Sequence, residues 1–438
     1  MAAIDLGAQA PELRRPRAGQ IAAVAAGNAL EFYDFLTYAF FAAQIGRCFF
    51  PSTDRMASLL ASLATFGAGF LMRPVGAFVL GRVGDRIGRK PAMLISIGLM
   101  GLGMTGLALT PSAAMIGPAA PVLAILFRLI QGFALGGEVG SSTTFLVEAA
   151  PPGRRGFYVS LQYMSQDFSI LCSGLVGFAL STQLTGPQLD AWGWRAAFLV
   201  GTLIVPFGLV MRRGLSETLN TGPKEEEAAR AGPPFPAIVA LCLMMLIAGT
   251  TVSYVMDYLT TMSTETLHMS ATVGFLAPIA VGGCGMIADP IGGLLSDRFG
   301  RKPVITCAWA LLALITVPAF ALLVRERSAA ALVGLAIVLQ FTGCIASSSS
   351  LTAVTESMPR RIRCGALGMT YAFAISIFGG STQFNVALLT KLTHSELVPA
   401  WYMTGGVLIG LAAMLFLPET SPAGLARRIG LRRAAAVA

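Results

Sequence analysis

Six charged side chains fall within apolar stretches of this 438-residue chain: Glu31, Asp34, Arg73, Arg128, Glu138 and Asp167. At a rise of about 1.5 Å per residue, five of them lie roughly 14–20 Å from one end of their stretch, and Arg73 lies at about 10 Å. A charge at mid-bilayer costs about 2.5–3.5 kcal/mol on insertion scales, so such residues usually face water or a partner. These six side chains are therefore the first candidates for function.

The two arginines are candidate anion-binding groups. A guanidinium stays protonated and forms two parallel hydrogen bonds with a carboxylate, which makes Arg128 the first candidate for a substrate contact. The alternative is a purely structural pair with Asp34 or Glu31. Arg73 is the second candidate, and its alternative is a side chain that extends to the membrane interface.

The acids are candidate proton carriers. Glu31 and Asp34 lie three positions apart and share a helix face with Asn28. Two acids close together in a poorly solvated cavity do not both ionise readily, so one of them is predicted to carry a proton. The alternative is that one is permanently paired with Arg128.

Two further acids and two histidines complete the search for a proton relay. Glu138 either carries a proton or packs between helices, because it follows two glycines. Asp167 belongs to a polar face predicted to line a cavity. His268 and His394 fall in segments outside the apolar stretches, so any relay must use carboxylates.

The second half of the chain is predicted to be neutral in the middle of its apolar stretches. Asp257 and Asp289 are expected near the ends of theirs, which leaves hydroxyl and amide groups to offer hydrogen bonds. The neutral substrate-binding candidates of both halves are Asn28, Gln131, Gln162, Gln166, Tyr371 and Asn385.

Composition identifies the environment of these residues. Hydrophobic residues make up 55% of the chain and charged residues 12%, whereas soluble domains carry roughly a quarter charged residues. Twelve apolar stretches are long enough to cross a bilayer, near 21–46, 57–80, 92–110, 121–147, 157–182, 196–211, 236–259, 272–292, 304–323, 330–355, 366–389 and 400–417. We therefore predict an all-α integral membrane protein of twelve transmembrane helices in two pseudo-symmetric six-helix bundles.

Charge asymmetry predicts the orientation. With the N-terminus inside, 23 of the 31 lysines and arginines fall in cytoplasmic segments, so both termini are predicted to be cytoplasmic. The net charge of +9 is then an orientation signal rather than a sign of nucleic-acid binding. The seven cysteines form no C-x-x-C pair, and we expect no metal site and no cofactor.

Two loop motifs occur once in each half. The pattern G-x-x-x-D-R-x-G-R-K covers 81–90 and returns at 293–302, and E-x-x-P-x-x-x-R begins at Glu148 and again at Glu356. Their acids and bases are predicted to form a cytoplasmic latch that closes in one conformation and opens in another; the alternative is positive-inside anchoring alone. The latch candidates are Asp85, Arg86, Arg89, Glu148, Arg155, Asp297, Arg298, Arg301, Glu356 and Arg363.

The duplication also divides the chain. Residues 1–20 are a predicted cytoplasmic tail, 21–211 a first bundle, 212–235 a polar cytoplasmic linker, 236–418 a second bundle and 419–438 a second cytoplasmic tail. We expect a monomer in the cell membrane, and lipid as its surroundings.

The paired loops resemble those of the major facilitator superfamily, and the resemblance covers almost the whole chain. Stretches 27–35, 69–76, 128–132 and 136–138 are similar to the metabolite:proton symporter branch, and 156–162 with Ser165 and Gln166 is most similar to citrate/tricarballylate–proton symporters. The resemblance implies two lobes with a central site reached alternately from each side, and uptake of an organic anion together with protons. Ser296 stands where the first loop has Gly84.

Other functions remain open at this point. The branch also includes carriers of dicarboxylates, shikimate or aromatic acids and zwitterionic osmolytes. The last group often carries a long C-terminal coiled coil, and the residues after Thr420 show no heptads. An exporter and a sensor built on the same scaffold are further alternatives. No nucleophile–base pair favours an enzyme.

Overall fold

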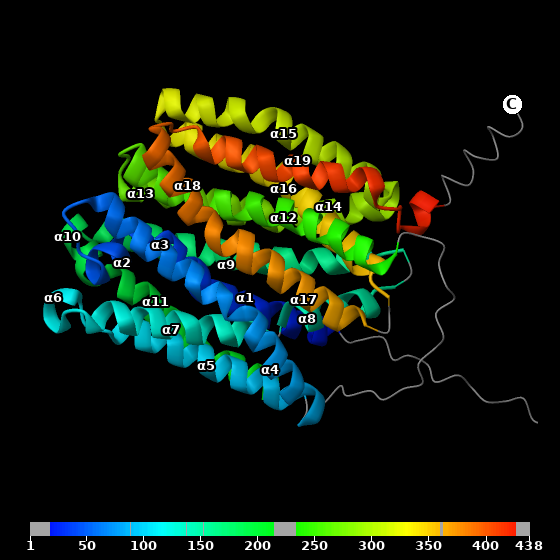
Figure 1. The fold of residues 1–438 in the computed structure, drawn as a ribbon, viewed down its shortest axis with the longest axis horizontal. Helices are drawn as coiled ribbons and strands as arrows, with labels where there is room; N and C mark the ends of the chain where they lie inside the picture. Colours follow the sequence, from blue (N-terminus) through cyan, green and yellow to red (C-terminus); the bar gives the residue numbers. More distant parts are fainter. Residues whose placement is uncertain are drawn as a thin grey trace, which may run out of the picture.

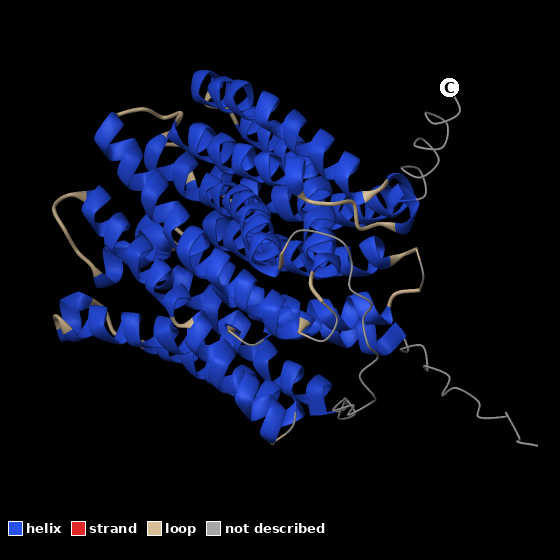
Figure 2. Cartoon of the chain, turned by 45° about the vertical axis from the view of Figure 1, so that its right-hand side comes forward, coloured by secondary structure: helices blue, strands red, loops and turns tan. Residues whose placement is uncertain are grey.

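The protein is described here by a computed structural model, which covers residues 18–87, 89–136, 138–151, 153–213, 234–359 and 362–425. All regular elements within these ranges are helical (Figure 2). The side chains of four predicted site residues lie outside the described part: Glu31, Asp85, Arg89 and Glu138. Most of the predicted linker lies outside it as well.

The first half, residues 18–213, holds these elements: α1 (Ala18–Phe40), α2 (Ala42–Phe49), α3 (Arg55–Leu71), α4 (Arg73–Arg86), α5 (Arg89–Leu109), α6 (Ala113–Ile116), α7 (Ala119–Leu135), α8 (Glu138–Ala149), α9 (Arg155–Gln183), α10 (Gly186–Gln188), the π-helical η1 (Leu189–Gly193) and α11 (Trp194–Arg213).

The second half, residues 234–425, holds these: α12 (Phe235–Thr261), η2 (Met262–Thr266), α13 (Ala271–Gly274), α14 (Leu276–Phe299), α15 (Arg301–Glu326), α16 (Ala329–Ser357), α17 (Arg363–Ala374), η3 (Ile375–Gly379), α18 (Gly380–Thr393) and α19 (Val398–Phe416). Helix covers each of the twelve apolar stretches. Some stretches are interrupted by a break or a π-helical turn, as between α3 and α4.

The helices suit a lipid environment. Helices satisfy their backbone hydrogen bonds internally, which is required where no water is present. By length and composition, seven helical segments of the described chain are apolar enough to cross a membrane. Large apolar side chains also point outward, including Leu203 at 78% exposure and Leu314 at 73%. These features define a multi-pass membrane protein.

The long helices run side by side, and the two halves meet along their length. In Figure 1, α15 and α19 form one side, α5 and α7 the other, and α1, α9 and α12 lie between them. The halves pack mainly through α9 against α14, α3 against α18 and α8 against α17. Each of these pairs joins one helix of the first half to one of the second.

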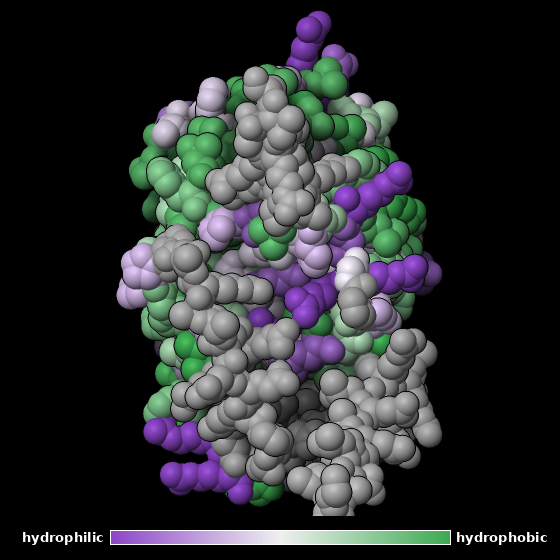
Figure 3. Space-filling view, turned by 90° about the vertical axis from the view of Figure 1, so that its right-hand side faces the viewer, coloured by the Kyte–Doolittle hydropathy of each residue, from purple (hydrophilic) through white to green (hydrophobic). Residues whose placement is uncertain are grey.

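The two ends of the bundle differ. The end at the right of Figure 1 carries the turns between α4 and α5 and between α14 and α15; we call it the motif end, and the other the opposite end. Figure 3 views the motif end and shows hydrophilic side chains gathered in the middle of that face. Gly300 turns the chain there with a φ of 105°, a conformation that favours glycine.

Candidate functional site

A cavity of about 60 Å³ lies between the two halves. Its lining includes Phe35 of α1, Gln166 and Asp167 of α9, and Tyr254 of α12. Pockets that hold small molecules usually measure about 300–1,000 Å³, so this arrangement of the helices leaves room for a few water molecules only. A larger ligand would enter when the halves move apart.

Three aspartates line this cavity, and two of them belong to the second half. Asp167 is joined there by Asp257 of α12 and Asp289 of α14. The prediction of a second half without mid-helix charge is therefore wrong. The reason lies in the helix ends: α12 continues to Thr261, and α14 runs on to Phe299 through the residues of the loop motif, which places Asp289 in the middle of its helix.

Arg73 and Arg128 are buried behind the cavity wall. Arg128 is 2% exposed and Arg73 5% exposed. The Arg128 guanidinium lies 4.4 Å from the centre of the Tyr38 ring and 5.7 Å from that of Phe35. The Arg73 guanidinium lies 5.2 Å from the same Phe35 ring. Such cation–π contacts stabilise a guanidinium without neutralising its charge.

Asp34 is linked to Arg128 through an amide. Gln131 Nε2 donates to Asp34 Oδ1 at 3.3 Å, and Arg128 Nη1 donates to Gln131 Oε1 at 2.7 Å. Asp34 Oδ2 and Arg128 Nε are buried and have no hydrogen-bond partner among the described groups. The cluster therefore keeps one free acceptor and one free donor.

Apart from Gln131, which bonds to Arg128 and Asp34, the neutral candidates separate into two groups. Gln166 and Tyr371 line the cavity. Asn28 and Gln162 instead bond to each other at 2.7 Å and join α1 to α9, and Asn385 lies 3.4 Å from the hydroxyl of Tyr402. The three residues of the second group do not line the cavity in this structure.

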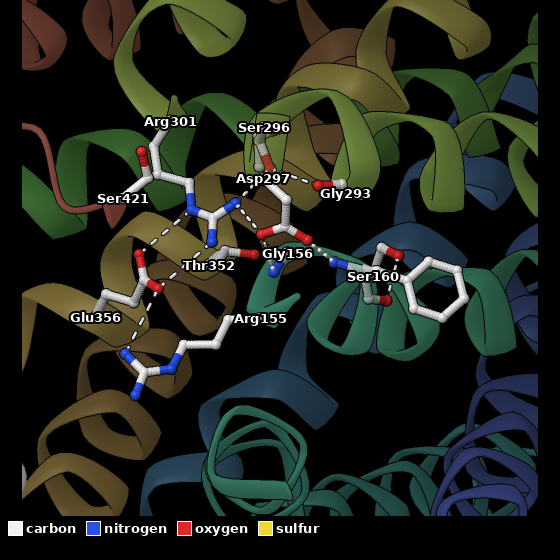
Figure 4. Close-up of polar contacts among 12 residues, drawn as sticks. Arg155, Gly156, Ser160, Gly293, Ser296, Asp297, Arg301, Thr352, Glu356 and Ser421 are labelled. Carbon is white, nitrogen blue, oxygen red and sulfur yellow. Dashed lines mark hydrogen bonds and ion pairs between the residues drawn. The ribbon is translucent and has the colours of Figure 1, made fainter. Parts of the chain in front are cut away.

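At the motif end, an aspartate of the second half caps a helix of the first. Asp297 accepts hydrogen bonds from the backbone N–H groups of Gly156 and Phe157 at 2.8 and 2.9 Å (Figure 4). A carboxylate at a helix N-terminus satisfies free N–H groups and interacts favourably with the helix dipole. The N-terminus of α9 is therefore held by the other half of the chain.

Arg301 extends this contact into a network. It pairs with Asp297 at 2.8 Å and with Glu356 at 3.3 Å, and it is 2% exposed. Glu356 also lies 3.9 Å from Arg155 of the first half (Figure 4). Four of the latch candidates thus come together across the interface, with Glu356 paired to Arg155 and Arg301.

The other latch candidates whose side chains are described make different contacts or lie on the surface. Arg363 donates to the carbonyl of Met358, and Arg298 lies over the Phe299 ring. Glu148 and Arg86 are exposed. Asp85 and Arg89 carry the matching motif of the first half, and their side chains lie outside the described part.

The opposite end is also joined by ion pairs, which the sequence analysis did not single out. Arg47 of α2 contacts Asp190 at 2.8 Å and Glu265 of η2 at 3.0 Å. Lys391 of α18 pairs with Asp54, which precedes α3. This hydrogen-bonded ammonium lowers the pKa of Asp54 below its ordinary value. Both ends of the bundle are thus tied across the halves, and the structure shows a closed arrangement.

Small residues of α14 were the signal that the sequence offered for Asp289. Gly282 and Gly285 lie on the face of α14 that packs on α9, and a methyl group at Gly285 would overlap the Asp167 carboxylate. Asp289 follows Gly285 by four positions and therefore shares that face. The glycines mark the face of α14 that packs closely on a neighbouring helix, so a polar residue on that face is expected to lie at the same interface.

The fold and site define a multi-pass helical membrane protein with a closed cavity between two related halves. The chain matches the Major Facilitator Superfamily over residues 27–382 and belongs to that superfamily.

Relatives of known name agree over nearly the whole chain. The protein is 36% identical to the citrate-proton symporter of Klebsiella pneumoniae, over 93% of this chain and 94% of that one. It is 33% identical to the alpha-ketoglutarate permease of Escherichia coli, over 92% and 94%. A crystal structure of a D-xylose-proton symporter matches with a TM-score of 0.74 at 19% identity, over 92% of this chain and 98% of that one, which shows the shared fold.

Proposed function

We propose that this protein is a proton-coupled symporter that imports an organic acid by alternating access, with a tricarboxylate such as citrate or tricarballylate as its substrate. The observation that carries the proposal is the arrangement of buried charge: acids line a cavity between two halves tied at both ends, and two arginines lie behind the wall of that cavity. The relatives named citrate-proton symporter support the choice of substrate.

In this proposal the arginines bind the substrate carboxylates. Phe35 and Tyr254 line the cavity with ring centres 5.8 Å apart, and Arg73 and Arg128 lie behind the Phe35 ring. When the halves separate, movement of these rings exposes the guanidinium groups to the cavity. The free Nε of Arg128 then has a place for a carboxylate oxygen.

The acids carry the protons, and the ion pairs control access. Asp34 and Asp167, with Glu31 and Glu138, are the proposed proton carriers. Loading protons and substrate together lowers the net charge of the cavity and so the cost of the closed state. The network of Asp297, Arg301, Glu356 and Arg155 closes the motif end, and it opens to release the substrate. Each net charge moved across the membrane contributes about 2.3 kcal/mol per 100 mV.

We further propose that the motif end faces the cytoplasm, with both termini, and that the protein acts as a monomer in the cell membrane. The excess of arginine and lysine in the segments at that end supports this orientation. Residues 21–211 and 236–418 would then form the two moving bundles, with 212–235 as the cytoplasmic linker.

A dicarboxylate is the second candidate substrate, because the chain is 33% identical to a protein named alpha-ketoglutarate permease. Uptake by purified protein in liposomes separates the alternatives, with labelled citrate, tricarballylate, alpha-ketoglutarate, shikimate and betaine, each with and without an inward proton gradient. We expect gradient-driven accumulation of a tricarboxylate that a protonophore abolishes. Accumulation of betaine alone would exclude the organic-acid proposal, and accumulation that ignores the gradient would exclude proton coupling.

A further inference from the structure

Two buried acids from opposite halves face each other across the helix interface. Asp167 lies mid-way along α9 and is 5% exposed; Asp289 lies mid-way along α14 and is 1% exposed. A carboxylate oxygen of Asp167, a carboxylate oxygen of Asp289 and the Sγ of Cys344 all lie within 4.8 Å of one another. The glycines of α14 permit this approach, since Gly285 leaves the space that the Asp167 carboxylate occupies.

The hydrogen bonds around the two acids are unequal. Asp167 accepts from Gln340 Nε2 at 3.2 Å and from the Cys344 thiol at 3.5 Å. Both oxygens of Asp289 are buried, and neither has a donor among the described groups. An ionised carboxylate buried without donors is strongly unfavourable. A protonated Asp289 removes that cost, because it can donate its own hydrogen to Asp167.

Among the described residues, no lysine or arginine interacts directly with either acid. The titratable groups that face the pair are Tyr163 of α9, Asp257 of α12, Cys284 of α14 and Cys344 of α16. No lysine or arginine is among the described residues that line the cavity. Asp34 differs in this respect, because Gln131 connects it to Arg128. The Asp167 and Asp289 pair therefore has no fixed positive partner among the described residues that line the cavity.

We propose that Asp167 and Asp289 hold one transported proton between them when the halves are closed, so that the proton site is shared by the two halves. This proposal rests on the proton coupling proposed above and adds Asp289 to it. A proton from water on one side forms an O–H bond on one carboxyl group, and that group donates to the other carboxylate. When the halves separate, the hydrogen bond between the acids breaks, and the proton leaves to water on the other side.

Because the two acids belong to different halves, a proton shared between them favours closure of the halves. Two ionised carboxylates at this distance repel each other, which opposes the packing of α9 on α14, whereas a single bridging proton turns the repulsion into a charge-assisted hydrogen bond. An empty carrier without this proton therefore closes less readily.

The test is Asp289→Asn in liposomes, measured in two assays. Asparagine keeps the size and a hydrogen-bond donor but binds no proton. We expect accumulation driven by a proton gradient to fall at least tenfold, while exchange of labelled for unlabelled substrate, which needs no net proton movement, stays within about threefold. Glu326→Gln is the control, since it removes an exposed acid of the second half that does not line the cavity, and it should keep accumulation within about threefold.

Other outcomes overturn the proposal. Wild-type accumulation by Asp289→Asn would show that the residue carries no transported proton. If a sodium gradient at constant pH drives uptake by the wild type and the variant loses that response, the pair holds a metal cation instead. If Asp289→Asn does not fold, Asp167→Asn tests the same pair, and Asp289→Glu should restore accumulation. Failure of the wild type to accumulate any acid under a proton gradient would instead refute the proposed function.

Discussion

Asp297 Oδ1 accepts a hydrogen bond from the backbone nitrogen of Gly156 at 2.8 Å, although the two residues are 141 positions apart. The contact joins a turn of the second half to the first turn of α9. It exists only while the halves are closed at the motif end, because Asp297 and Gly156 belong to different halves. Arg301 pairs with Asp297 and with Glu356, and the three side chains are at most 8% exposed.

Replacing Asp297 should open the motif end. Asp297→Ala removes the cap of α9 and leaves the buried Arg301 with one carboxylate fewer; losing one partner of a buried ion pair costs about 3–5 kcal/mol. We expect transport to fall at least tenfold and a cysteine at Ser160 in a cysteine-free background to react faster with a water-soluble thiol reagent. Arg298→Gln, at the exposed neighbouring position, should stay within twofold. Unchanged reactivity after Asp297→Ala would mean that the network does not control access.

Close approach of α9 and α14 should be necessary for transport. A methyl group at Gly293 would lie 2.6 Å from the carbonyl oxygen of Gly156, whereas one at Gly283 meets nothing within 4 Å. Gly293→Ala is therefore expected to keep the motif end apart and reduce uptake at least fivefold, while Gly283→Ala transports normally. Equal uptake by the two variants would show that the helices need not pack this closely.

Arg128 should bind substrate rather than only balance Asp34. Arg128→Gln is expected to weaken substrate binding at least tenfold, about 1.4 kcal/mol or more, in calorimetry on protein that elutes as a single species in detergent. The double variant Arg128→Gln with Asp34→Asn separates the two roles. If Arg128 only neutralises Asp34, removal of both charges restores binding; if it contacts the substrate, binding stays weak.

The ion pair at the opposite end should not respond to mild acid. Because Lys391 lowers the pKa of Asp54, the pair stabilises the closed end at pH 5 and at pH 8 alike, since both lie above the ordinary aspartate pKa of about 3.9. That contribution disappears only as the pH falls through the lower folded value. Thiol access from this end should therefore be the same at pH 5 and pH 8 in the wild type, and Asp54→Asn should raise it equally at both. A rise in the wild type at pH 5 alone would contradict this reading.

The sequence by itself determined the membrane class, the duplication and the family, because apolar length, charge asymmetry and repeated turn motifs are local properties of the chain. It also placed Gln166 and Asp167 on a polar face predicted to line a cavity, and both line the cavity between the halves, as does Tyr371 of α17. Asp297 and Arg301 could be named because they occupy charged positions of a motif that occurs twice in the chain.

Only the tertiary structure decided which charges meet. Glu356 pairs with Arg155 and Arg301, and Arg47 pairs with Glu265. Both sets of partners depend on how the two halves pack, which the spacing of residues along the sequence does not reveal. The structure also placed Asp289 opposite Asp167, because α14 extends through the loop motif and so carries Asp289 to mid-helix. A shift of one helix end by two turns moves a side chain from the membrane surface to the cavity, and hydropathy does not fix helix ends that closely.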